Sequence, residues 1–130
     1  MATRAMFHLP EELGRVIIDH CAAALPNEGC GMLAMDGYEV VKVYPMANEE
    51  ASPSSYTVPP QEHFDAMMDA ESNGWRLGGV FHSHPHGSAR MSAVDLERAL
   101  EPDWLYLVVG MGGEKPAIVA WLGGRDVRLE

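Results

Sequence analysis

The sequence is poor in cysteine and in basic residues, and each shortage excludes a class of protein. Only two cysteines, Cys21 and Cys30, occur in 130 residues, so we expect free thiols rather than a disulfide framework. Nine basic residues stand against nineteen acidic ones, which makes the net charge −10. Because nucleic-acid binding requires clustered lysine and arginine, and an anionic membrane surface repels negative charge, neither is an expected partner.

Long apolar runs are also missing. None approaches the ~20 residues that a membrane-spanning helix needs, and the N-terminal stretch MATRAMFH lacks the apolar core of a signal peptide. We therefore expect a cytoplasmic protein. Hydrophobic residues make up 47% of the chain, which has the size and composition of a single globular domain covering residues 1–130. Its oligomeric state is left open.

Periodicity and turn signals predict an α+β protein (α/β in the broad sense) that mixes antiparallel hairpins with three helices. In the first half, apolar spacing predicts a helix from Pro10 to Ala24, and a hairpin follows with Asp36-Gly37 as its two-residue turn. Residues 45–60 read as a loop, in which residues 56–58 have the composition of a short strand. Glu28 then stands at the entrance of the first strand.

In the second half, a helix is expected from about Pro60 to Asn73. We expect its Phe64, Met67 and Met68 to face inward. The remaining expected elements are a buried strand ending near residue 84, a helix over residues 94–100, and strands over residues 104–109, 116–122 and 126–129.

The stretch GVFHSHPHGSARMSAVD, residues 79–95, carries the chemistry. Because side chains alternate along a strand, His82 and His84 should project together while Ser83 points away. Ser92 is a good helix N-cap, which places Asp95 in the first turn of the following helix. Two imidazoles and one carboxylate with a fourth position open are typical of a catalytic zinc site. Taken separately, the histidine pair also suits ordinary packing and the Ser-x-x-Asp pair ordinary helix capping.

A hydrolytic zinc site also needs a general base for its water, and Glu28 is the candidate. Glu28, the run His82-Ser-His-Pro85, Ser92 and Asp95 together resemble the complete signature of the JAMM (MPN-plus) metallopeptidases. The resemblance extends over nearly the whole chain and is greatest to small stand-alone bacterial members. It implies a curved mixed central sheet flanked by helices, in a cytidine-deaminase-like layout.

The resemblance also implies a mechanism and a substrate class. His82, His84 and Asp95 would bind Zn²⁺, Glu28 would act as the general base, and Ser92 would hydrogen-bond the developing oxyanion. The family cleaves after the C-terminal Gly-Gly of ubiquitin-like proteins. Small bacterial members resemble enzymes that act on β-grasp sulfur-carrier proteins, for example by releasing cysteine.

Two other functions are possible on the same residues. A non-catalytic MPN-type scaffold that binds proteins is one, although such relatives lose ligand positions and this chain has lost none. A zinc deaminase is the other, but it would require a Pro-Cys-x-x-Cys ligand pair that the sequence lacks. His86 is a further candidate ligand that the signature does not require, and Cys30 is a possible nucleophile whose glycine-rich setting favours a buried thiol.

Overall fold

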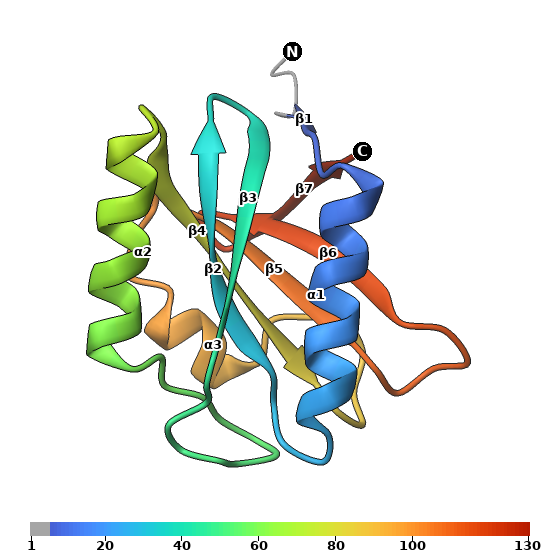
Figure 1. The fold of residues 1–130 in the computed structure, drawn as a ribbon. Coiled ribbons are helices and arrows are strands. Elements are labelled where there is room, and N and C mark those ends of the chain that lie inside the picture. The colour runs from blue at the N-terminus through green and yellow to red at the C-terminus, as the bar shows by residue number, and fades with distance from the viewer. Residues whose placement is uncertain (1–5) are drawn as a thin grey trace.

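A computed structural model describes residues 6–130, which form one seven-stranded mixed sheet with helices on both faces (Figure 1). The strands are β1 (Met6–Phe7), β2 (Cys30–Asp36), β3 (Glu39–Met46), β4 (Arg76–His84), β5 (Leu105–Gly110), β6 (Ala117–Leu122) and β7 (Arg125–Leu129). The helices are α1 (Glu11–Ala24), α2 (Pro60–Ser72) and α3 (Ala93–Arg98). The predicted mixed sheet flanked by helices is thus confirmed.

The strand order is β1-β7-β6-β5-β4-β2-β3, with β4 near the middle. β4 pairs antiparallel with β2 and parallel with β5, so both of its edges are hydrogen-bonded. β1 pairs parallel with β7, and this short strand was not anticipated from the sequence. Among residues 6–130, no helix has the length and apolar character required to cross a membrane.

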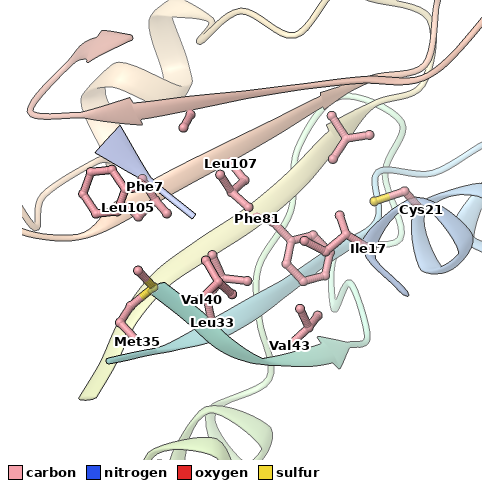
Figure 2. Close-up of a cluster of buried hydrophobic side chains, with 12 residues drawn as sticks. Phe7, Ile17, Cys21, Leu33, Met35, Val40, Val43, Phe81, Leu105 and Leu107 are labelled. Atoms are coloured by element: carbon pink, nitrogen blue, oxygen red, sulfur yellow. The ribbon is translucent and has the colours of Figure 1, made fainter. Parts of the chain in front are cut away.

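One face of the sheet is covered by α1. Ile17 and Cys21 of this helix lie in a buried cluster with Phe81 of β4 and Leu33 of β2 (Figure 2). The cluster leaves no room at Gly31, where an added Cβ would clash with the Phe81 ring and with the Tyr44 carbonyl oxygen. A glycine is therefore required on β2 where it crosses the aromatic ring of β4.

The other face is covered by α2, and here the expectation is wrong for two of the three residues named. The buried residues of α2 are Ala66 and Ala70, whereas Phe64 and Met68 remain 51% and 49% exposed. Met67 alone of the three expected residues packs partly against the core. The side of α2 that meets the sheet is therefore the one that carries Ala66 and Ala70, and Phe64 and Met68 lie on other sides of the helix.

The hairpin between β2 and β3 differs from expectation by one residue. Asp36 pairs with Glu39, so the two turn residues are Gly37 and Tyr38 rather than Asp36 and Gly37. Gly37 has φ +60° and is the first turn position, where type II′ turns place glycine. After β3, which runs on to Met46, residues 56–58 form no strand and belong to the loop that precedes α2.

Candidate metal centre

The C-terminal end of β4 presents two imidazoles side by side. His82 Nε2 and His84 Nε2 lie 3.2 Å apart, as expected for alternate residues that share one face of a strand. Ser83 points the other way and accepts a 2.8 Å hydrogen bond from the backbone N–H of Gly29. The strand ends at His84, immediately before Pro85, because proline cannot donate to the sheet.

A carboxylate reaches the same point from α3. Asp95 Oδ2 lies 3.1 Å from His82 Nε2 and 3.0 Å from His84 Nε2. The helix begins at a complete capping box, in which Ser92 Oγ accepts from the Asp95 N–H and Asp95 Oδ2 accepts from the Ser92 N–H. The cap therefore fixes the position of the third candidate ligand.

The electrostatics of this group follow from its contacts. Burial alone would raise the pKa of Asp95, but hydrogen bonds from His82 and His84 outweigh it and hold that pKa well below its usual range. The hydrogen bond to Asp95 in turn raises the pKa of His84. Before any ion enters, the carboxylate is ionised and the site is suited to a positive charge.

The donor set fits a zinc ion. Its two imidazole nitrogens and one carboxylate oxygen lie 3.0–3.2 Å apart. Tetrahedral zinc with bonds of about 2.0–2.1 Å separates its ligand atoms by roughly 3.3 Å. His84 Nδ1 lies 2.9 Å from the Ser88 carbonyl and must donate to it, which leaves the Nε2 lone pair for a metal in the neutral ring. His82, His84 and Asp95 are accordingly a candidate site with three protein ligands.

Glu28 lies beside this group in the segment that leads into β2. It is only 3% exposed, and no residue in the described part of the chain hydrogen-bonds its Oε1. Burial is the main cause that raises its pKa to about 7. Its backbone is tied on both sides, since its N–H donates to Ser52 O at 2.8 Å and its carbonyl accepts from Asn48 Nδ2 at 3.1 Å.

The buried carboxylate of Glu28 and the exposed Ser92 line one cleft of about 280 Å³, together with His84. Ser92 Oγ accepts the 3.0 Å hydrogen bond from the Asp95 N–H, so its own hydroxyl proton is available for a second partner. Three of the five residues singled out in the sequence thus line one opening, and the other two, His82 and Asp95, contact His84 directly.

Two other residues, His86 and Cys30, were considered as a possible ligand and a possible nucleophile. His86 is exposed on the rim of the cleft. Cys30 is fully buried, and burial raises the pKa of its thiol to about 12, so it remains protonated. Cys21 and Cys30 are both free, as expected.

Tyr56 is a site residue that the sequence did not indicate. Its ring stacks on the His82 imidazole with centroids 4.8 Å apart and planes inclined by 17°. Tyr56 belongs to the loop between β3 and α2, which has no periodic pattern from which its position could be predicted.

Comparison with known proteins supplies independent information. Residues 10–123 match the family described as prokaryotic homologs of the JAB domain. A desampylase of Haloferax volcanii is 36% identical over 95 residues, 71% of this chain and 68% of the relative. A probable TtuB-protein conjugate cleaving protease of Thermus thermophilus is 32% identical over 127 residues, 95% of this chain and 82% of the relative. A CysO-cysteine peptidase of Mycobacterium bovis is 30% identical over 100 residues, 75% of this chain and 68% of the relative.

Solved structures show the same fold. The solution structure of a protein from Desulfitobacterium hafniense superposes with a TM-score of 0.85 at 33% identity, covering 97% of this chain and 92% of the other. A JAB1/MPN domain protein from Archaeoglobus fulgidus superposes with a TM-score of 0.63, covering 98% of this chain and 97% of the other. At 18% identity the second likeness concerns the fold alone, and it confirms the predicted MPN layout.

Proposed function

The chain belongs to the family of prokaryotic homologs of the JAB domain, and we propose that it is a zinc-dependent peptidase of the JAMM type. The observation that carries the proposal is the buried carboxylate of Glu28, whose Oε1 has no hydrogen-bond partner among residues 6–130 and which shares a cleft with His84 of the three-residue group. A buried acid facing an ion site with an open position is the arrangement that metal-assisted hydrolysis requires.

His82, His84 and Asp95 would hold the zinc ion, which when bound supplies Lewis-acid activation of water and of the carbonyl. Glu28 takes a proton from the attacking water and delivers it to the leaving amine, so that water is added across the amide bond. Its pKa of about 7 in the metal-free protein suits both halves of that transfer. Ser92 donates its free hydroxyl proton to the carbonyl oxygen as negative charge develops there.

We further propose that the substrate is a ubiquitin-like (β-grasp) sulfur-carrier protein, cut after its C-terminal Gly-Gly. Three relatives support this class, because they are named as a desampylase, a TtuB-conjugate cleaving protease and a CysO-cysteine peptidase. Cysteine is one leaving group consistent with these names, and a peptide or a lysine side chain are others. We assign the activity to a single domain of residues 1–130 acting in the cytoplasm, where free thiols persist.

Hydrolysis of a β-grasp carrier whose terminal Gly-Gly is amide-linked to cysteine tests the proposal. Mass spectrometry should show loss of cysteine with the zinc-loaded protein. Glu28→Gln should lower the rate by about 10²–10⁴-fold, because it removes the general base. It should still bind one zinc ion, since Glu28 is not a ligand. Glu49→Gln, an exposed change on the neighbouring loop, is the matched control and should cleave normally.

Two results would contradict the proposal. Undiminished turnover by Glu28→Gln would remove Glu28 from the role of base. One bound zinc with no cleavage of cysteine, peptide or lysine adducts of the carrier would leave the metal site but reject the peptidase. That second result would favour the protein-binding scaffold.

A further inference from the structure

The two histidines of the site are held in different ways. The Nδ1 of His84 donates to the Ser88 carbonyl at 2.9 Å, which fixes both its tautomer and the plane of its ring. His82 is 1% exposed, yet no hydrogen-bond partner for its Nδ1 occurs in residues 6–130. The Nε2 side of the His82 ring faces Asp95 and His84, but on the Nδ1 side the plane of the ring is held by packing and not by a hydrogen bond.

Tyr56 provides that packing. Its ring lies nearly parallel to the His82 ring, at 17° and 4.8 Å between centroids. A rotation of the His82 imidazole about its Cβ–Cγ bond would drive its edge into the tyrosine face. The stacked ring thus limits the torsion that swings Nε2 away from the Nε2 of His84 and the Oδ2 of Asp95.

The backbone of Tyr56 is anchored at three successive residues. The Ser55 carbonyl accepts from Asn48 Nδ2 at 2.9 Å, and the Thr57 N–H donates to Asn48 Oδ1 at 3.2 Å. Between them, the Tyr56 carbonyl accepts from Arg98 Nη1 at 3.2 Å. Arg98 also lies 3.4 Å from Glu50 Oε2, so α3 is tied to this loop by two contacts.

We propose that Tyr56 is a positioning residue for His82, and that Asn48 and Arg98 hold it in place. Arg98 lies one turn after Asp95 on α3, so the same short helix supplies one ligand and anchors the ring that orients another. The inference rests on the proposed zinc site but not on the peptidase activity. Partners that orient metal ligands typically contribute 10–100-fold to metal affinity.

Zinc affinity of the intact protein, measured by competition with a chromogenic chelator, tests this role without any substrate. Tyr56→Leu should weaken zinc binding by about 10-fold or more, because it removes the flat ring. Tyr56→Phe keeps the ring and should stay within about 2-fold of the wild type. Tyr38→Leu is the matched control, since Tyr38 is 64% exposed in the β2–β3 turn and touches none of the ligands.

A spectroscopic measurement separates orientation from general loosening. With Co²⁺ in place of zinc, the visible d–d absorption reports ligand geometry, and it should change in Tyr56→Leu but not in Tyr56→Phe. Should Tyr56→Leu fail to fold, the exposed Arg98 can be replaced instead. Arg98→Ala should then weaken zinc binding, whereas Arg15→Ala, which removes an exposed ion pair on α1, should not.

The inference is overturned if zinc binds Tyr56→Leu as tightly as the wild type, with an unchanged Co²⁺ spectrum. It is also overturned if Tyr56→Phe is as weak as Tyr56→Leu, because the hydroxyl and not the ring would then matter. A wild-type protein that binds no zinc would instead reject the proposed function itself.

Discussion

The two halves of the candidate metal site differ in how they are supported. His82 and His84 stand on β4, which is paired on both edges and buried from Leu77 to Ser83. Asp95 stands on α3, a helix of six residues of which none is buried. Two of the three candidate ligands are therefore held by a buried central strand, while the third is held at the surface by its helix cap and by side-chain contacts.

This difference predicts that substitutions in the two halves have different effects. Substitutions of the buried side chains of β4 should reduce the stability of the whole domain, because they remove packing from a central strand of the sheet. Changes in α3 should leave the domain folded and act on the site alone, since its tethers are single hydrogen bonds worth about 1 kcal/mol each. The predictions below test whether stability and site geometry are divided between the two halves in this way.

The largest expected effect is a loss of stability when a buried side chain of β4 is removed. Phe81→Ala should lower the free energy of unfolding by about 3–5 kcal/mol, because Phe81 is fully buried in the cluster with Ile17 and Leu33. Leu96→Ala on α3 is the matched change, and since Leu96 is 48% exposed the loss should stay within about 0.5 kcal/mol. Urea unfolding of the metal-free proteins measures both. Similar losses for the two variants would show that α3 belongs to the core after all.

The next largest expected effect is a loss of catalytic rate when Ser92, at the start of α3, is replaced. Ser92→Ala should reduce kcat by about 10²–10³-fold, because it removes the proposed donor to the oxyanion. The lost cap should cost only about 1 kcal/mol of stability, seen as a small fall in Tm. Ser92→Thr, which keeps the hydroxyl, should restore most of the rate. Ser72→Ala at the end of α2 is the control for losing an exposed helix-end hydroxyl. A normal kcat in zinc-loaded Ser92→Ala would limit Ser92 to capping.

The smallest effect concerns the buried acid. The pKa of Glu28 is raised to about 7 in the folded protein, mainly by burial, so ionising it there costs more than in the unfolded chain. Stability is therefore lost as pH rises from about 4.5 through 7. With metal removed, Glu28→Gln should be more stable than the wild type by roughly 1–3 kcal/mol at pH 8, and the difference should shrink toward pH 5. Thermal unfolding across this range measures it, and a difference that grows toward acid pH would contradict the assignment.

The buried half of the site could be predicted from the sequence because its signals are local and periodic. Alternation along the strand placed His82 and His84 on one face and Ser83 on the other, and Pro85 marked the end of the strand. The position of Ser92 relative to Asp95 followed equally from helix capping, and the observed capping box confirms it. Residue types at fixed spacing were sufficient for each of these features.

The features that the sequence did not predict depend on contacts between distant segments. Tyr56 reaches His82 because Asn48 and Arg98 hold the loop, and these partners lie up to 42 residues apart in sequence. Phe64 and Met68 were expected to face inward, but the side of α2 that packs on the sheet carries Ala66 and Ala70. Neither the side of a helix that meets a sheet nor the path of an irregular loop is fully determined by hydrophobic spacing.

One atom, Asp95 Oδ2, makes contacts both within α3 and with the two histidines, and these contacts would couple the order of α3 to ion binding. It accepts the Ser92 N–H that starts α3 at 2.9 Å, and it also faces both imidazoles. A helix this short is not stable alone, so its order depends on such contacts. Binding of an ion to the Asp95 carboxylate would stabilise the ordered form of α3. Because linkage is reciprocal, ordering of α3 would strengthen ion binding by the same free energy. Amide hydrogen exchange in α3 would then serve as a gauge of site occupancy, while the amides of β4 would exchange slowly whether or not the site is filled.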